Sequence, residues 1–266
     1  MQPAPPSTIS SRRAEVDLLS ENEAHVWLAN PEEIQEPALL ERYLALLGPQ
    51  ERERHQRLRR EQSQREFLVA HALARLTLSR YAPVPPEAWS FCFGEHGRPE
   101  IGLPSDARWL HFNLSHTRGM VVCAVVRELE IGVDVENAAR RLRHRDLAER
   151  FFGGAEVEAL RALALEERAG RFLELWTLKE AYLKARGLGI SIPLRSFQLQ
   201  LSDSDPPRIS FDPAVVRDDA ASWQFALHHP SRSHTLALAI RRPDRRKVAI
   251  RYFEGVPGEV LMNDPG

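Results

Sequence analysis

Apolar residues recur every three or four positions in several parts of the chain, which is the spacing of one face of an α-helix. The first such stretch begins near residue 38 and is broken by Gly48 and Pro49. Four further helices are predicted by the same spacing, at 62–81, 147–152, 155–168 and 171–186. The last of them stops at Gly187, as expected for a glycine that caps a helix C-terminus.

Shorter apolar runs between these helices predict β-strands, because turn residues bound them and several are rich in β-branched or aromatic residues. The predicted strands are 25–29, 89–93, 111–114, 120–126, 129–136, 197–201, 222–227, 234–240 and 248–253. Arg127 and Glu128 are expected to form a hairpin or a short crossover. Each half of the chain shows strands, then helices, then more strands, which predicts an α+β fold of two similar lobes.

The predicted organisation has four parts. Residues 1–20 are rich in Pro and Ser and are expected to be a disordered lead-in. Residues 21–127 form the N-terminal α+β lobe and residues 128–241 the C-terminal α+β lobe. Residues 242–266 form a C-terminal tail that adds one strand and then frays.

Composition excludes several classes of protein. The formal net charge of −1 over 266 residues gives no overall field that would attract nucleic acid. Two cysteines cannot build a disulfide framework or a cysteine-based zinc site. The longest apolar run, 120–126, is far shorter than the roughly 20 residues that cross a bilayer. We therefore expect a cytoplasmic protein without membrane or nucleic-acid contacts.

The strongest chemical pattern combines a strand with a distant helix. Asp134 and Glu136 project from one face of a strand because side chains alternate, while Val133 and Val135 point into the core. Paired carboxylates favour a hard divalent cation such as Mg²⁺ between them. On the helix, Glu180 and Lys184 lie one turn apart and share a face. Taken singly, the strand carboxylates are equally consistent with an edge strand in solvent, and the helix pair with an ordinary surface ion pair.

Ser115 and His116 form a second pattern, directly before the apolar strand at 120–126. At a turn they would present a hydroxyl, backbone N–H groups and an imidazole to a phosphate. A plain turn with a solvated histidine is the alternative. Arginines, which pair with phosphate through two parallel hydrogen bonds, gather between residues 52 and 65 and again at Arg98. Acidic residues alternate with the first group, so part of it is expected to be a solvated helix face.

Several ordered blocks of the sequence resemble the Sfp-type family of 4′-phosphopantetheinyl transferases. The most specific are Ile131-Gly-Val-Asp-Val-Glu136 and Trp176-Thr-Leu-Lys-Glu-Ala-Tyr-Leu-Lys184. The others are Arg65–Arg75, Gly97-Arg-Pro99, His111-Phe-Asn-Leu-Ser-His116, Arg150-Phe-Phe152 and Gly187–Leu194. The resemblance covers roughly residues 25–240 and implies a pseudodimer of two related α+β lobes, with coenzyme A bound in the cleft between them.

The resemblance also implies roles for individual residues. Asp134, Glu136 and Glu180 would hold Mg²⁺, which also binds the pyrophosphate of coenzyme A. Cofactor-binding roles would fall to Ser115 and His116 at the 3′-phosphate, to Arg54, Arg65 and Arg98 as further phosphate or adenosine partners, and to Lys184. Lys179 would either help to bind phosphate or have a structural role.

The reaction implied is attack of a serine hydroxyl of an acyl or peptidyl carrier protein on the β-phosphate of coenzyme A, with release of 3′,5′-ADP. Glu180, directly or through a water molecule, would be the base, and Lys184 would stabilise the leaving phosphate. The carrier could serve fatty-acid, polyketide, peptide-synthetase or siderophore synthesis. The basic stretch 140–145 is a candidate docking surface, with a solvated loop as the alternative, and the chain is expected to act as a monomer.

Two other functions remain open at the level of sequence. One is a module that binds carrier proteins or coenzyme A without modifying them. The other is a Mg²⁺-dependent phosphohydrolase that releases 3′,5′-ADP from coenzyme A when no carrier is present. Both would retain the same acidic and basic motifs for another purpose.

Overall fold

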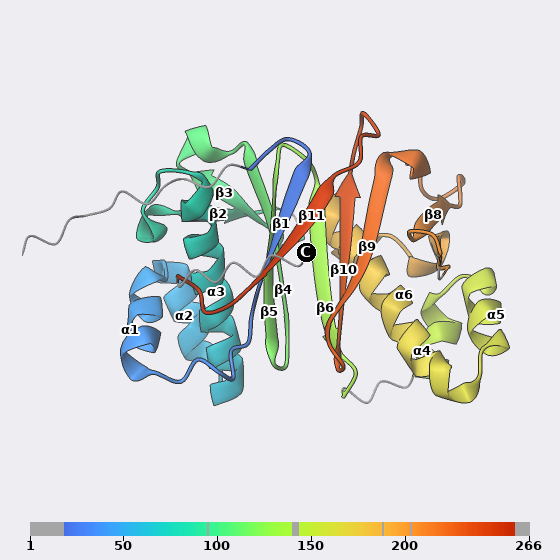
Figure 1. Cartoon of the computed structure of the whole chain (residues 1–266), viewed down its shortest axis with the longest axis horizontal. Helices are drawn as coiled ribbons and strands as arrows, with labels where there is room; N and C mark the ends of the chain where they lie inside the picture. The colour runs from blue at the N-terminus through green and yellow to red at the C-terminus, as the bar shows by residue number, and fades with distance from the viewer. Residues whose placement is uncertain (1–18, 95, 140–143, 188, 203, 259–266) are drawn as a thin grey trace, which may run out of the picture.

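The computed structural model describes residues 19–94, 96–139, 144–187, 189–202 and 204–258 (Figure 1). The predicted lead-in, residues 1–20, lies outside this part of the chain except for its last two residues. The end of the predicted tail, residues 259–266, also lies outside it.

The first lobe contains two sheets and three α-helices. Its elements are β1 (Glu23–Ala29), α1 (Pro37–Leu46), α2 (Pro49–Arg57), α3 (Glu61–Tyr81), β2 (Ser90–Phe93), β3 (Pro99–Leu103), β4 (Leu110–Thr117) and β5 (Met120–Arg127). The strands β1, β5 and β4 form a sheet in that order, and β2 pairs with β3 in a separate hairpin.

The second lobe repeats this order of elements. They are β6 (Ile131–Asn137), α4 (His144–Phe151), α5 (Gly154–Ala162), α6 (Leu165–Arg186), β7 (Phe197–Gln200), β8 (Arg208–Phe211), β9 (Trp223–Ser231) and β10 (His234–Arg241). The sheet order is β6-β10-β9, and β7 pairs with β8. The repeated order confirms the predicted α+β pseudodimer.

The two sheets lie face to face in the centre of the molecule, and the helices cover their outer sides (Figure 1). The period of two along the central strands produces this layering. Val121, Cys123 and Val125 of β5 pack on the helices of the first lobe. Val122 and Val126 point the other way, into the core shared by both sheets. Both faces of β5 are therefore buried, which explains its unbroken apolar sequence.

Each lobe also contains a buried ion pair in the same place. In the first lobe, Arg75 of α3 donates to Glu51 over 2.6 Å, and Glu51 accepts the Gly48 N–H at the start of α2. In the second lobe, Lys179 of α6 lies 2.9 Å from Glu156, and Glu156 accepts the Gly153 N–H at the start of α5. The correspondence of these pairs fixes which residues of the lobes are equivalent.

β11 (Ala249–Glu254) confirms the strand predicted at 248–253. It runs parallel to β1 and adds a fourth strand to the first sheet, giving the order β11-β1-β5-β4. Among the described residues, the last strand therefore pairs with the first, although the two are far apart in the sequence.

Some predicted boundaries were wrong. The break between the last two helices was predicted near Gly170, but α6 runs through this glycine and begins at Leu165. A glycine costs a helix only about 1 kcal/mol, which packing outweighs, and the chain turns earlier, where Glu167 accepts the Ala164 N–H. Of the two connections predicted at Arg127 and Glu128, the hairpin was wrong, and the short crossover is what the structure shows, since it leads from β5 to β6 in the other sheet. The short elements α2, β3 and β8 were not predicted as separate elements.

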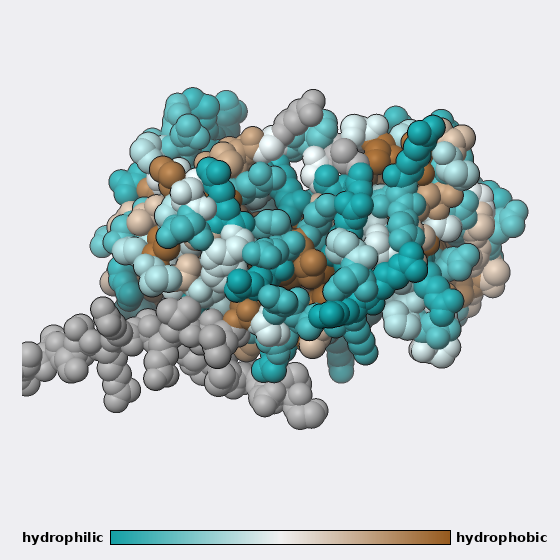
Figure 2. All heavy atoms as spheres, turned by 90° about the horizontal axis from the view of Figure 1, so that it is seen from above, coloured by the Kyte–Doolittle hydropathy of each residue, from teal (hydrophilic) through white to brown (hydrophobic). Residues whose placement is uncertain are grey.

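Polar residues cover most of the face seen from above, with apolar residues in small scattered groups (Figure 2). None of the described helices is long and apolar enough to cross a membrane.

Candidate active site at the seam between the lobes

The edge strands β4 and β6 meet where the two lobes join, and side chains of β4 bind the backbone of β6. Asn113 Oδ1 accepts the Val133 N–H at 2.9 Å, and Ser115 Oγ accepts the Val135 N–H at 3.2 Å. These bonds replace part of the ladder that a neighbouring strand would provide. They hold Ser115 beside Asp134, so the two motifs predicted separately form one site.

Asp134, Ser115 and Lys184 form a hydrogen-bonded cluster across this seam. Asp134 Oδ1 accepts from Ser115 Oγ at 2.9 Å and from Lys184 Nζ at 2.6 Å. Lys184 Nζ also lies 2.9 Å from Ser115 Oγ. Three elements, β4, β6 and α6, therefore each contribute one side chain.

The backbone of β6 lets α6 approach closely enough to make these contacts. A Cβ atom at Gly132 would lie 2.0 Å from the Ala181 carbonyl oxygen and 2.3 Å from the Ala185 nitrogen. Any larger residue would push the helix away, because real Cβ atoms never come so near other heavy atoms. Gly132 thus sets the separation between β6 and the last turns of α6, which carry Glu180 and Lys184.

The remaining two carboxylates lie on the same elements as the cluster: Glu136 is two residues after Asp134 on β6, and Glu180 is one turn before Lys184 on α6. Burial raises the pKa of Glu180, and the nearby Asp134 and Glu136 carboxylates raise it further, while Lys184 opposes them. Val133 and Val135 are buried in the core between the sheets, as predicted, and Asp134 and Glu136 are also largely buried.

This carboxylate group fits a divalent cation by its chemistry. Within the described part of the chain, Asp134 Oδ2 is buried and has no hydrogen-bond partner. A buried carboxylate oxygen without a partner is costly, and a cation removes that cost. The described residues hold no group of three acidic, imidazole or thiol side chains already gathered closely enough to enclose a metal ion. The single observation that favours a cation among the described residues is the unpartnered Asp134 Oδ2.

Basic residues line the side of the seam that belongs to the first lobe. Desolvation lowers the pKa of His116, and the charges of Lys184, His71 and Arg54 lower it further. His71 lies on α3 and contacts Glu51, with 2.8 Å between Nδ1 and Oε1. His71 was missed from the sequence, although it lies inside the block Arg65–Arg75, because a single histidine in a helix carries no signal of its own.

Several predicted residues make other contacts in the structure. Ser115 and His116 lie within β4 and not at a turn as expected, because the strand continues to Thr117. Lys179 is fully buried and donates to the Leu194 and Phe197 carbonyl groups, which supports the structural one of the two roles predicted for it. Its role is structural.

Two predicted arginines are engaged with the protein itself. Arg65 pairs with Glu61 one turn earlier in α3, at 3.0 Å. Arg98 donates to the Ala185 carbonyl near the end of α6 and lines a cavity of about 670 Å³ with Arg108, Arg186 and Arg241. Residues 140–143 of the predicted docking stretch 140–145 lie outside the described residues.

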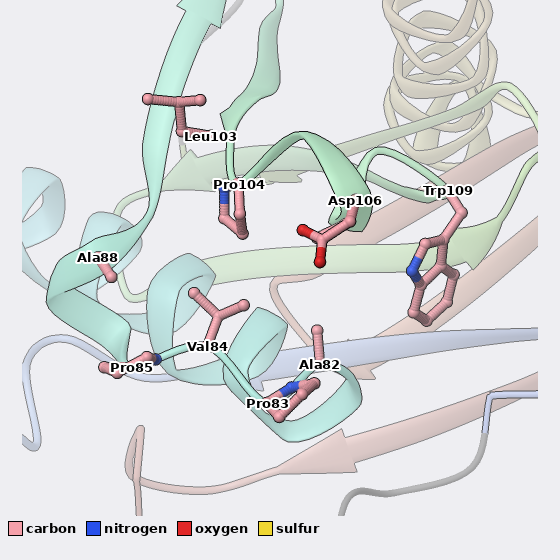
Figure 3. A pocket seen from close by; sticks show the side chains of 10 residues that line it. Ala82, Pro83, Val84, Pro85, Ala88, Leu103, Pro104, Asp106 and Trp109 are labelled. Atoms are coloured by element: carbon pink, nitrogen blue, oxygen red, sulfur yellow. The ribbon is translucent and has the colours of Figure 1, made fainter.

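A separate cavity of about 610 Å³ lies in the first lobe, away from the seam (Figure 3). Prolines and apolar side chains such as Val84 and Trp109 form most of its wall. Asp106 is the one charged side chain among the described residues that line it. A cavity of this chemistry does not suit a phosphorylated ligand, whereas the seam does.

Comparisons with known proteins identify the family to which the chain belongs. The family model described as the 4′-phosphopantetheinyl transferase superfamily matches residues 130–240, which include β6 and α6. The 4′-phosphopantetheinyl transferase HetI of Nostoc is 34% identical over 210 residues, covering 76% of this chain and 86% of that protein.

Two further relatives have similar identity over shorter stretches. The 4′-phosphopantetheinyl transferase Sfp of Bacillus subtilis is 32% identical over 161 residues, covering 60% of this chain and 69% of Sfp. A putative 4′-phosphopantetheinyl transferase of Synechocystis is 37% identical over 153 residues, or 58% of this chain, which spans 62% of that relative's length. From its own motifs and from these relatives, the chain belongs to the Sfp-type 4′-phosphopantetheinyl transferase family.

Proposed function

We propose that the chain transfers the 4′-phosphopantetheine moiety of coenzyme A to a serine of an acyl or peptidyl carrier protein and releases 3′,5′-ADP. The observation that carries the proposal is the hydrogen-bonded cluster of Asp134, Ser115 and Lys184 where the two lobes join. The Glu136 and Glu180 carboxylates, on the same strand and helix as Asp134 and Lys184, lie within electrostatic range of it. Such a site combines groups for a cation, for a phosphate and for a proton, as phosphoryl transfer requires.

Mg²⁺ is the proposed cofactor. Asp134, with its unpartnered Oδ2, Glu136 and Glu180 are the residues that would hold it. When bound, the ion would offset the charge on the pyrophosphate oxygens. Mg²⁺ typically keeps several waters and takes its other ligands from carboxylates and phosphates. This preference is consistent with a site whose protein carboxylates do not enclose the ion by themselves.

Glu180 is the proposed base. Its raised pKa makes it a stronger proton acceptor than an ordinary carboxylate at neutral pH. Glu180 accepts the serine proton, directly or through a water molecule, as the serine oxygen bonds to the β-phosphorus. The bond from that phosphorus to the bridging oxygen then breaks, and 3′,5′-ADP leaves.

Lys184 acts on the leaving group. Its ammonium group, which lies 2.6 Å from Asp134 Oδ1 in the structure, would donate a hydrogen bond to the departing phosphate. On the other side of the seam, Arg54, Ser115 and His116 would bind the 3′-phosphate region. His71 would add a further basic side chain there. Arg65 and Arg98 complete the proposed contacts to coenzyme A, and both would have to give up the partners described above.

The proposed enzyme acts in the cytoplasm as a monomer, because one chain contains both lobes of the seam. Its partner is a carrier protein, and its proposed metabolic setting is fatty-acid, polyketide or nonribosomal peptide synthesis. The proposal includes no nucleic acid and no membrane.

Intact-mass measurement tests the function directly. The full chain is incubated with coenzyme A, Mg²⁺ and each of several apo carrier proteins. We expect at least one carrier to gain the mass of one phosphopantetheinyl group, with 3′,5′-ADP formed in equal amount. Adduct formation should stop with excess EDTA and return when Mg²⁺ is restored.

The same experiment separates the rival functions. A module that only binds would leave every carrier at its original mass. A phosphohydrolase would release 3′,5′-ADP from coenzyme A in the absence of any carrier. Either result would contradict the proposal, and full activity in EDTA would contradict its Mg²⁺ dependence alone.

A further inference from the structure

A buried carboxylate, Asp218, lies on the far side of α6 from the seam. Its side chain is 1% exposed. Asp218 Oδ2 accepts from Tyr182 Oη at 3.0 Å, from Arg186 Nη1 at 3.1 Å and from Trp223 Nε1 at 3.1 Å. The residue sits in the connection between β8 and β9 and contacts no residue assigned to the reaction.

Two of these donors flank Lys184 on α6. Tyr182 precedes it by two residues and Arg186 follows it by two. Residues two apart on a helix point to roughly opposite sides. Asp218 binds Tyr182 and Arg186 on one side of α6. Lys184 therefore projects from the opposite side of the helix into the seam, where it contacts Asp134.

The contact network continues from Asp218 to the strand that carries the seam carboxylates. Arg241 at the end of β10 lies 3.9 Å from Asp218 and 2.8 Å from Glu130. Glu130 immediately precedes β6, and its carbonyl group also accepts the Arg241 N–H. Asp218 is therefore connected both to the end of α6 and to the start of β6.

The first lobe has no such arrangement at the equivalent positions of its long helix. Counted from the matching residues Arg75 and Lys179, Tyr182 corresponds to Leu78 and Arg186 to Ala82. Both of these are buried apolar residues, at 0% and 3% exposure. An apolar contact is thus sufficient to build this fold, and buried charges carry a desolvation cost that an apolar core avoids. At these two positions, the lobe that bears the desolvation cost is the one with Glu180 and Lys184.

We propose that Asp218 is a positioning residue for transfer, which fixes the rotation of the last two turns of α6 and so places Lys184 against Asp134. The proposal rests on the proposed function for its kinetic consequence, but the effect on α6 is independent of activity.

Asp218→Asn is the test variant, because it keeps the shape of the side chain and removes its charge. Asp219→Asn is the matched control, since Asp219 is adjacent and exposed, and its side chain accepts from Arg245 and from the Ala221 N–H, neither of which lies on α6. We expect Asp218→Asn to lower kcat about 10- to 100-fold, as expected for displaced catalytic groups, with KM for coenzyme A nearly unchanged. Asp219→Asn should match the wild type.

A Lys184→Ala background shows whether the effect passes through Lys184. There, Asp218→Asn should change the residual kcat very little. The same loss in both backgrounds, or normal kcat in Asp218→Asn, would overturn the proposal. Tyr182→Phe, which keeps the ring and removes one donor, provides a milder variant should Asp218→Asn fold poorly, and it should lower kcat in the same direction.

Amide hydrogen exchange provides the measurement that does not depend on activity. Amides of residues 183–187 should exchange about tenfold faster in Asp218→Asn at unchanged global stability, because opening of the helix end becomes easier. Unchanged exchange there would overturn the proposal even if kcat fell. If the wild-type chain transfers nothing to any carrier, the proposed function fails, and hydrogen exchange still decides the role of Asp218.

Discussion

The two lobes share one order of elements but reach different chemistry at equivalent positions. Trp27 and Asp134 occupy equivalent positions in the two lobes. Trp27 pairs with Cys123, the fourth residue of β5, and Asp134 pairs with Ala237, the fourth residue of β10. Arg80 follows Arg75 by five residues, as Lys184 follows Lys179. The first lobe places the Arg80 guanidinium 4.7 Å from the Trp27 ring, where the second lobe has the ion pair of Lys184 with Asp134. A cation–π contact thus stands where the other lobe has a polar site.

The same comparison extends to the neighbouring positions. Leu76 occupies the position of Glu180, one residue after the buried cation. Where the second lobe has Gly132, the first has His25, which hydrogen-bonds Tyr81 at 2.8 Å. The fold tolerates either set, so the chemistry is a property of a few side chains and not of the architecture.

The two seams also differ in what fills them. β4 meets β6 at the proposed active site, whereas the equivalent edges, β9 and β1, are separated by β11. Phe253 stacks on Trp27 with 4.5 Å between ring centroids, and Tyr252 stacks on His228 at 4.1 Å. Val248 and Gln224 exchange two hydrogen bonds next to them. β11 therefore fills the seam opposite the proposed active site, where the equivalent edges do not meet directly.

The largest difference between the lobes should appear when their equivalent residues are replaced. Asp134→Asn should lower the rate of transfer by on the order of 10²–10³-fold, because it removes charge stabilisation in a buried site. Trp27→Phe keeps an aromatic ring and should leave the rate per folded molecule unchanged. Carrier modification followed by intact mass checks both. Equal losses in the two variants would contradict the assignment of the site to one seam.

Lowering the pH should show how much the buried Glu51 carboxylate of the first lobe stabilises the folded chain. Burial alone would raise the pKa of Glu51, but His71, the Gly48 N–H and Arg75 outweigh it and lower that pKa from 4.5 to about 2. The folded pKa is depressed, so the stabilisation is present above pH 4.5 and is lost as the pH falls towards 2. Its size at neutral pH is on the order of 3 kcal/mol.

Urea unfolding between pH 2 and pH 7 measures this contribution. The free energy of unfolding of the wild type should fall steeply below pH 4.5, and Glu51→Gln should lose that part of the slope. Parallel curves for the two proteins would show that Glu51 does not carry the effect.

The close approach of β6 and α6 can be tested with two glycines. Gly132→Ala should destabilise the protein by about 1–3 kcal/mol, because its Cβ collides with the backbone of α6, and should also lower the transfer rate. Gly170 lies within α6, and a Cβ atom there would meet nothing within 4 Å. Gly170→Ala should therefore stabilise the protein by up to about 1 kcal/mol. Chemical denaturation compares them, and a harmless Gly132→Ala would show that α6 is not held at this distance.

The smallest expected effect is a gain in stability. The raised pKa of Glu180 means that its carboxylate is less favourable in the folded chain than in the unfolded one above that pKa. Glu180→Gln should therefore raise the free energy of unfolding at pH 7 without metal, while transfer is lost. Glu174→Gln, a neighbour paired with Arg171, is the control and should not stabilise. A thermal midpoint below that of the wild type would contradict the proposed repulsion.

Local patterns predicted much of this structure. The alternation in β6 placed Asp134 and Glu136 together, and the helical spacing placed Glu180 and Lys184 on one face. What local patterns could not give is the partner of each residue across the fold. The bond between Ser115 and Asp134 joins β4 to β6 in different lobes, and Lys179, five residues before Lys184, turns instead to Glu156. The closing role of β11 depends on contacts with β1, at the other end of the chain.

The position of a metal ion relative to the two seams tests the central claim most directly. Crystals grown with coenzyme A and Mn²⁺ in place of Mg²⁺ would show the ion by its anomalous scattering. The account predicts one strong peak bounded by the carboxylates of Asp134, Glu136 and Glu180, with the pyrophosphate beside Lys184. A peak elsewhere, or coenzyme A bound without contact to these residues, would contradict it.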